Sequence, residues 1–157
     1  MDVTNNEKDL GVFIDERLDF NYHITTQVKK GRSMAGILQR NISHKTKDIM
    51  IPLYKALVRP LLEYAVSVWC PYKKKDIKKL EDVQRHFTKR IKGMKDLDYQ
   101  ERLQKLKLPS LMYRRIRGDM IEVFKILNNY YDPITTSSLL TLHKTKHNTR
   151  TNNNKLV

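Results

Sequence analysis

The stretch LYKALVRPLLEYAVSVWCP, residues 53–71, is the most hydrophobic part of the chain. Its apolar residues recur at helical spacing and form one wide face, made of Leu53, Leu57, Leu61, Tyr64 and Val68, with Val58, Leu62, Ala65 and Trp69 beside them. A face this wide predicts the central, most buried helix of a helical domain. Pro60 is expected to kink this helix, because its ring removes a hydrogen bond and clashes with the preceding turn. Pro71 is expected to end it.

Amphipathic segments lie on both sides of this central stretch. Residues 74–93 form the clearest helix of the chain, with an apolar stripe of Ile77, Leu80, Gln84, Phe87 and Ile91. A second helix is expected from Asn21, a plausible N-cap, with a stripe of Ile24, Val28, Ala35, Leu38 and Ile42. Gly31 falls on that stripe, where glycine costs about 1 kcal/mol relative to alanine. It therefore indicates either a close helix contact or a break in the helix.

The remaining segments complete a mainly α fold. Asp98 is expected to cap a short helix that Pro109 closes, and Ser110 to open another. The stripe of that last helix comprises Tyr113, Ile116, Met120, Val123 or Phe124, and Leu127. Residues 10–14, LGVFI, indicate a single short strand. In residues 133–157, twelve of the side chains are Ser, Thr or Asn and none is aromatic, so a disordered basic tail is expected.

We therefore predict a helical bundle of four or five helices. Residues 1–20 would form a β-strand remnant, residues 21–132 the helical domain, and residues 133–157 the tail. A chain of 157 residues with 39% hydrophobic residues supports one modest core, which excludes a multidomain enzyme.

The charge of the chain points to polyanionic partners. Lys and Arg number 31 against 17 Asp and Glu, which gives a net charge of +14. One cysteine excludes an internal disulfide and a multi-cysteine zinc site, and it fits a reducing compartment, nuclear or cytoplasmic. Arg59 and Glu63 interrupt the best apolar run, and the N-terminus has no signal-peptide pattern, so no membrane span is expected.

The basic residues of the 74–93 helix are the candidate site. At 100° per residue, Lys78, Arg85, Lys89 and Lys92 share an arc of about 60°, away from the apolar stripe. The functional interpretation is a ridge that contacts phosphates, with Tyr72 and His86 available for stacking or sugar contacts. The alternative is a solvated helix face. Residues 21–40 carry four bases and no acid, which favours polyanion binding.

Other candidates are interpreted as structural. Arg114, Arg115 and Arg117 are interpreted as ordinary surface residues, where Arg115 has Asp119 four residues on and Arg114 has no such partner. Arg59 is expected to form a structural ion pair with Glu63. Cys70 is expected to be a packed thiol. His143 and His147 lie in a segment dominated by Thr and Asn, and metal binding there is disfavoured. No carboxylate cluster suggests a two-metal site, so we expect no metal, no cofactor and no small-molecule substrate.

Four strings in order carry a resemblance to a known family. They are DLGVFIDERLDF (9–20), LYKALVRPLLEYAVSVWCP (53–71), KKKDIKKLEDVQRHFTKRIKG (73–93) and YQERLQKLKLPSLMYRRIRGDMIEVFKIL (99–127). Together they resemble the region downstream of the polymerase core in jockey-like non-LTR (LINE-type) retrotransposon reverse transcriptases. The most specific pieces are Leu53-Tyr54, Leu57-Val58-Arg59-Pro60, Leu62-Glu63-Tyr64-Ala65, Trp69, Leu80-Glu81 and Val83-Gln84-Arg85.

The resemblance implies a thumb-type region that contacts the template–primer duplex. Leu10-Gly11-Val12 with Asp15 would correspond to the last strand on the palm side. The Tyr-x-Asp-Asp turn and the earlier palm carboxylate of the family would lie upstream of residue 1, so the chain is expected not to be an enzyme. It would retain binding of RNA, DNA or a hybrid duplex without sequence readout. The alternatives are a protein-interaction or structural module, which docks a palm domain or self-associates, and a decayed transposon remnant without activity.

Overall fold

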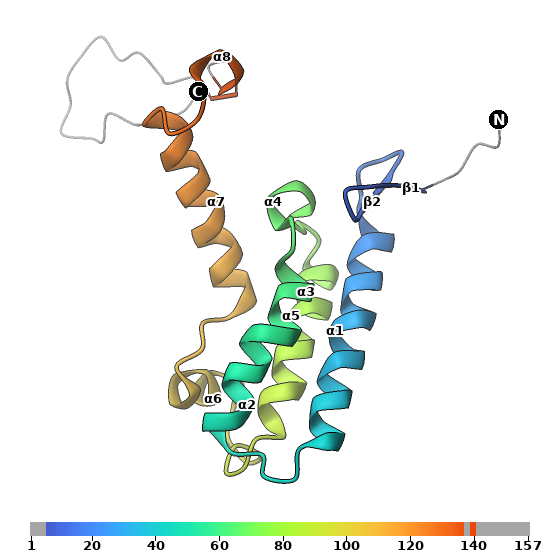
Figure 1. Ribbon diagram of the computed structural model, residues 1–157, viewed down its shortest axis with the longest axis vertical. Coiled ribbons are helices and arrows are strands. Elements are labelled where there is room, and N and C mark those ends of the chain that lie inside the picture. The colour runs from blue at the N-terminus through green and yellow to red at the C-terminus, as the bar shows by residue number, and fades with distance from the viewer. Residues whose placement is uncertain (1–5, 137–138, 141–157) are drawn as a thin grey trace. The chain divides into compact units, whose positions relative to one another are not determined.

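The computed structural model describes residues 6–136, 139 and 140. The chain divides into two compact units, Met1–Ile116 and Arg117–Val157. The predicted mainly α class is confirmed, and a short sheet precedes the helices (Figure 1). The elements are β1 (Asn6–Asp9), β2 (Val12–Asp15), α1 (Asn21–Asn41), α2 (Lys47–Leu53), the π-helical turn η1 (Tyr54–Val58), α3 (Arg59–Glu63), α4 (Val66–Trp69), α5 (Lys74–Lys89), α6 (Tyr99–Leu106), α7 (Leu111–Leu127) and α8 (Pro133–Thr136).

The N-terminal strand is one half of a hairpin. β1 pairs antiparallel with β2, with Asp9 opposite Val12, and Leu10 and Gly11 form the turn between them. Both turn residues have positive φ, 43° and 90°, as a two-residue hairpin turn requires. The sequence predicted one strand only, because β1 is entirely polar and exposed and carries no apolar alternation.

The turn into α1 is held by a carboxylate. The Asp15 side chain accepts hydrogen bonds from the backbone N–H groups of Arg17 (3.2 Å), Asp19 (2.9 Å) and Phe20 (2.7 Å). Phe20, with φ 51°, is the residue that caps α1, so the expectation of an N-cap at Asn21 is wrong by one residue. Asp15 therefore orders the loop from outside the helix, and α1 begins without a side-chain cap of its own.

The central stretch is broken where one helix was expected. Tyr54, Val58 and Leu62 are fully buried, whereas Leu57, Tyr64 and Val68 of the predicted main face are exposed. Two features of the backbone change which residues of this stretch point into the core. Pro60 lies at the start of α3 directly after η1, whose wider turn accommodates a ring that would clash in an α-helix. The chain then leaves the helical conformation at Ala65, where φ is 50°, before α4 begins.

Gly31 marks a close helix contact, which settles the two alternatives left open by the sequence. It is buried on α1, and a Cβ atom built there would lie 2.7 Å from Leu62 Cδ2 on α3. That separation is shorter than real Cβ contacts allow, so only glycine lets the two helices approach this closely. α1 also packs along α5.

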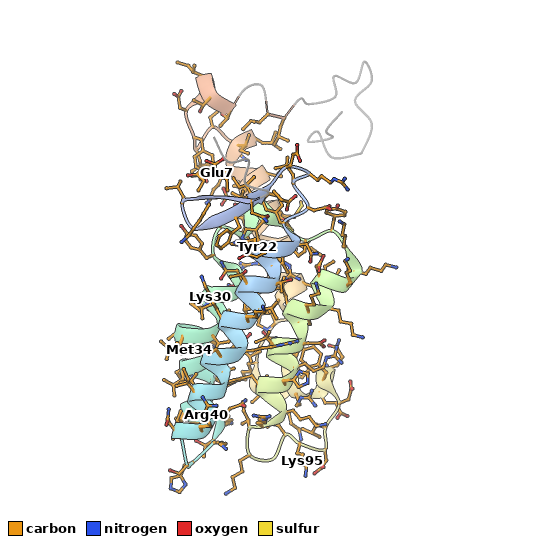
Figure 2. All side chains as sticks on the ribbon, turned by 90° about the vertical axis from the view of Figure 1, so that its right-hand side faces the viewer. Glu7, Tyr22, Lys30, Met34, Arg40 and Lys95 are labelled. Carbon is orange, nitrogen blue, oxygen red and sulfur yellow. The ribbon has the colours of Figure 1, made fainter. Side chains whose placement is uncertain are left out.

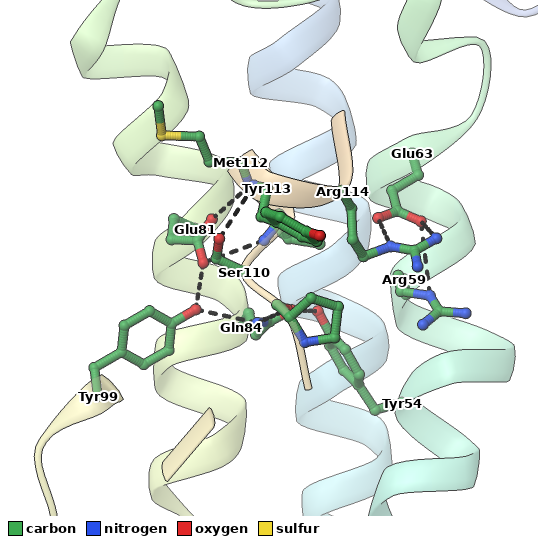
Figure 3. A network of polar contacts seen from close by, with 12 residues as sticks. Tyr54, Arg59, Glu63, Glu81, Gln84, Tyr99, Ser110, Met112, Tyr113 and Arg114 are labelled. Atoms are coloured by element: carbon green, nitrogen blue, oxygen red, sulfur yellow. Dashed lines mark hydrogen bonds and ion pairs between the residues drawn. The ribbon is translucent and has the colours of Figure 1, made fainter. Parts of the chain in front are cut away.

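A buried polar network ties α5 to its neighbours (Figure 3). Tyr54 donates a hydrogen bond to Gln84 Oε1 (2.7 Å). Gln84 in turn donates through Nε2 to the Tyr99 hydroxyl (3.1 Å) and to the Pro109 carbonyl (3.0 Å). The amide therefore joins η1, α6 and the loop before α7 to a single position on α5. Gln84 replaces an apolar residue on the α5 stripe because all its polar atoms find partners there.

The Glu81 carboxylate extends this network to the start of α7. It accepts the hydroxyl of Tyr99 and the backbone N–H groups of Leu111 (3.3 Å) and Met112 (3.2 Å). The first N–H groups of a helix have no partner within the helix, and an anion there also matches the helix dipole. Burial, followed by the bond to Glu81, raises the pKa of Tyr99, so this hydroxyl keeps its proton and remains a donor.

The helix starts predicted at Asp98 and Ser110 are both observed. The Asp98 side chain accepts from the backbone of Gln100 (3.2 Å), and Glu101 reaches back to the backbone N–H of Asp98 (3.0 Å) in a capping box. The hydrogen bonds from the backbone of Tyr99 and Gln100 lower the pKa of Asp98. The Ser110 hydroxyl accepts the N–H of Tyr113 (3.1 Å).

Part of the predicted disordered tail is helical, since α8 covers residues 133–136. The rest of the tail, with His143 and His147, lies outside the described residues apart from Leu139 and Leu140. Among the described residues, none of the helices has the length and apolar character needed to cross a membrane.

Gly31→Ala is expected to lower the free energy of unfolding by roughly 1 kcal/mol. The new Cβ overpacks the buried Leu62, a cost of about 1–3 kcal/mol, against a gain of about 1 kcal/mol in helix propensity. The matched control is Gly36→Ala on the same helix, where a Cβ meets nothing within 4 Å. That variant should be stabilised by up to about 1 kcal/mol. Urea unfolding measures both, and equal effects of the two substitutions would contradict the close contact.

Glu81→Ala is expected to destabilise the protein by roughly 3 kcal/mol, because it leaves the Tyr99 hydroxyl and two backbone N–H groups without their acceptor. Glu81→Gln keeps the shape and loses the charge, so its effect should be smaller. Glu16→Gln, at an exposed position, serves as the control and should change stability by less than about 0.5 kcal/mol. A near-neutral Glu81→Ala in urea unfolding would show that the network does not hold α7.

Candidate nucleic-acid interface

The carboxylates of α5 are mostly turned away from solvent. Asp76 is 1% exposed and pairs with Lys79 Nζ at 2.7 Å, and Glu81 is buried in the network at the start of α7. Only Asp82 remains on the outer part of the helix, partly exposed. The surface of α5 is therefore more cationic than its sequence indicates, because Glu81 is used by contacts inside the protein and Asp76 offsets only Lys79.

Lys78 and Lys89 are the clearest members of the predicted ridge. Both are exposed, and no ion pair is found for either of them among the described residues. Lys74 and Lys75 add two further exposed cations in the first turn of the helix. Like charges at this density repel one another, and that repulsion is relieved when phosphates or counterions approach.

Arg85 lies on the same face but has structural contacts. Its guanidinium carbon lies 4.6 Å from the centre of the Tyr99 ring, and its Nε is 3.5 Å from Asp82 Oδ1. The Arg102 guanidinium also lies near that ring, at 5.5 Å. The stacking fixes the orientation of Arg85 while 48% of its side chain stays exposed, so it can present N–H donors outward.

Lys92 does not belong to the helical arc. α5 ends at Lys89, three residues before Lys92, and the Lys92 backbone N–H donates to the carbonyl of Lys45 at 2.9 Å. The prediction that placed it by helical projection is wrong, because the projection holds only while the backbone remains helical. Its side chain is exposed, beside the loop that connects α1 and α2.

Tyr72 and Lys73, ahead of α5, are engaged in a structural contact. Lys73 Nζ lies 2.5 Å from Asp19 Oδ1, and the Tyr72 hydroxyl donates to the same oxygen at 2.7 Å. The hydrogen bonds from Lys73 and Tyr72 lower the pKa of Asp19, and the bond to Asp19 raises the pKa of Lys73. Asp19 thus offsets a cation at a helix start, where the dipole disfavours it.

A hollow on one flank of α5 extends the basic surface beyond the predicted residues. It is lined by Arg85, His86 and Lys89 of α5, and by Lys95, Asp96, Leu97, Asp98, Tyr99 and Arg102. Sequence reasoning missed Lys95 and Arg102 because they lie outside the 74–93 helix and approach it only through the fold.

The residues interpreted as structural behave in three different ways. Arg59 pairs with Glu63 as expected, Nε to Oε2 at 3.6 Å. Arg114, for which no partner was predicted on its own helix, binds the same carboxylate through two bonds, at 2.6 and 3.0 Å (Figure 3). Arg115 is buried and Cys70 is exposed, so the expectations of a surface arginine and a packed thiol are both wrong. No group of three metal-ligating side chains is found in the described part of the chain.

Comparison with known proteins adds one relative of unknown activity. The chain is 26% identical over 132 residues to the uncharacterized protein B0403.1 of Caenorhabditis elegans. The aligned region covers 82% of this chain and 67% of that protein. No protein-family model and no solved structure matches the chain.

Replacing Asp19 by Asn should lower the melting temperature at pH 7 and have progressively less effect in acid. The folded-state pKa of Asp19 lies below its ordinary value, so its contribution is present above that ordinary value, near pH 4, and is lost as pH falls through the lowered one. Melting curves of both proteins between pH 7 and pH 3 measure the difference. A difference that stays constant over this range would show that the Asp19–Lys73 contact does not stabilise the fold.

Proposed function

We propose that the protein binds nucleic acid, either RNA, DNA or a hybrid duplex, through phosphate contacts made by α5, and that it does not read the base sequence. The observation that carries this proposal is the division of charge on α5. Glu81 is used inside the protein and Asp76 pairs with Lys79 of the same helix, while Lys78 and Lys89 are exposed and have no ion pair among the described residues. A net charge of +14 adds a long-range attraction for the same ligand.

The side chains on this face suit phosphate better than bases. A lysine ammonium is a compact charge on a flexible stem, and it contacts a phosphate wherever one passes. Base readout instead requires donors and acceptors held at fixed positions in a groove. Arg85 is the one α5 cation whose orientation is fixed by stacking, and one fixed arginine does not specify a sequence.

The resemblance to the region that follows the polymerase core in jockey-like reverse transcriptases supports the same proposal. In that family the corresponding helices lie against the template–primer duplex, and the chemistry belongs to carboxylates of the core. We accordingly assign binding, and no phosphoryl transfer, to this chain. A protein with this role works in the nucleus or the cytoplasm.

A second candidate function, a protein-interaction module, is favoured by α7. Met112, Tyr113 and Ile116, at its start, are large apolar side chains that are each about half exposed. Apolar side chains grouped on one helix often mark a protein contact. Oligomerisation that is insensitive to salt would favour this candidate, whereas binding of nucleic acid that weakens steeply with salt favours the first.

Replacing Lys78 and Lys89 together by Gln should weaken duplex binding and leave folding nearly unchanged. Each lost phosphate contact lowers the slope of log affinity against log salt by about 0.9, so the pair should lower it by roughly 2. The loss should be the same for unrelated duplex sequences, because phosphates carry no base information. Fluorescence anisotropy at several salt concentrations measures the slope.

The matched control replaces Lys29 and Lys30 of α1 by Gln, because these lysines are also exposed and also lack an ion pair among the described residues. Both double variants lower the net charge by two. Equal weakening by the two would mean a diffuse charge effect and no interface on α5.

A further inference from the structure

A second hollow lies along the seam where α1 and α5 pack together. Figure 2 shows the two helices side by side. The hollow encloses about 370 Å³ and is lined by Arg32, Ala35, Gly36 and Gln39 from α1, by Val83, His86 and Phe87 from α5, and by Arg90, which follows the end of α5. His86 also lines the hollow formed with Lys95 and Arg102.

The two arginines that line this hollow are not neutralised by an acid. None of its lining residues is Asp or Glu. Arg32 is exposed, and no ion pair is found for it among the described residues. Arg90 donates from Nη1 to Gln39 Oε1 at 2.5 Å, which orients its guanidinium group through a neutral amide. Since Gln39 is buried, this orientation is set before any ligand arrives.

His86 forms part of the wall beside the two arginines. Its Nδ1 lies 2.6 Å from the backbone carbonyl of Asp82, which can only accept, so Nδ1 carries the hydrogen. In the neutral ring Nε2 is then an acceptor, and an acceptor does not attract an anion. The positive charge in the hollow comes from Arg32 and Arg90.

Gly36 keeps the α1 side of the hollow open. It lies in the middle of a regular helix, where glycine costs about 1 kcal/mol relative to alanine. A Cβ at this position would meet nothing within 4 Å, so no packing contact requires the glycine. Gly31, five residues earlier, is required by the contact with Leu62, so the two glycines have different roles.

We infer that this hollow is a binding site for a single phosphate group, held between the guanidinium groups of Arg32 and Arg90. Two guanidinium groups that line one acid-free hollow repel each other, and a phosphate anion between them offsets that cost. The planar fork of each guanidinium matches two phosphate oxygens. The phosphate is either part of a nucleic-acid backbone, a case that depends on the proposed function, or belongs to a free phosphate compound.

Three variants test the site. Arg32→Gln with Arg90→Gln removes the two ligands. Arg17→Gln with Arg40→Gln is the matched control, because both of these arginines are exposed and neither lines the hollow. Gly36→Leu fills the hollow, keeps both arginines, leaves the net charge unchanged and favours the helix. It therefore tests the site even if the loss of the Arg90–Gln39 hydrogen bond weakens the fold.

The first measurement uses inorganic phosphate alone. In the wild-type protein, phosphate should shift the Nε–Hε signals of Arg32 and Arg90 in ¹H–¹⁵N NMR spectra, with chloride at equal ionic strength as the reference. Gly36→Leu should weaken this binding by roughly tenfold or more, and the control should not. The double substitution removes both signals, so in that protein the backbone amide signal of Gly36 is followed instead and should no longer shift with phosphate. Shifts that are equally large in the Gly36→Leu protein would overturn the site.

The second measurement separates the sources of the phosphate and uses a labelled oligonucleotide duplex. If the site takes a backbone phosphate, Gly36→Leu should lower the salt slope by about 0.9, one phosphate contact. If inorganic phosphate binds at Arg32 and Arg90 but the oligonucleotide affinity is unaffected by Lys78, Lys89 and Gly36 variants alike, the site holds a free phosphate compound and the proposed function fails. If the Lys78 and Lys89 variants weaken duplex binding but phosphate does not bind in the hollow, the proposed function stands and this inference fails.

Discussion

The Glu81 carboxylate at the start of α7 is the constraint on which the arrangement of this helical unit depends. A helix that begins against other helices leaves backbone N–H groups away from water, and here one buried anion on α5 accepts two of them together with the hydroxyl of Tyr99. One turn further along α5, Gln84 joins Tyr54 and the Pro109 carbonyl to the same helix. The buried side of α5 thus fixes where η1, α6 and the start of α7 can lie.

This use of carboxylates on the inside has a consequence for the outside of the same helix. Asp76 offsets Lys79 of the same helix, but Glu81, which would offset another lysine if it faced solvent, has partners within the protein instead. Lys78 and Lys89 therefore remain uncompensated on the outer face, and Arg85 is held over the Tyr99 ring whose hydroxyl Glu81 accepts. The network that stabilises the fold and the cationic surface proposed to bind phosphate are two sides of one helix, and a change in Glu81 affects both.

Local patterns predicted the parts of this structure that local forces determine. The α5 stripe and the Asp98 cap could be inferred from the sequence, since each depends on residues within a few turns. At Gly31 the sequence left a close contact and a break open, because the contact is with Leu62 on another helix. The buried face of residues 53–71 could not, because the π-helical turn before Pro60 and the break at Ala65 change which residues point inward. The α1–α5 hollow could not be predicted either, since Arg32 and Arg90 are 58 positions apart and line one hollow only because α1 and α5 pack together. For the ridge, the sequence identified Lys78, Arg85 and Lys89 on one face, and it misplaced Lys92 because no pattern marked the end of the helix at Lys89.

The most direct test of the central claim is the salt dependence with which the unmodified protein binds a short nucleic-acid duplex. Anisotropy titrations with two duplexes of unrelated sequence and one RNA–DNA hybrid give log affinity against log salt for each. The charge division on α5 predicts binding to all three duplexes. On the DNA duplexes, log affinity should fall with log salt with a slope of about −2 or steeper, and the affinities for the two unrelated sequences should be equal. Absence of binding at low salt, or an affinity that does not change with salt, would contradict the account.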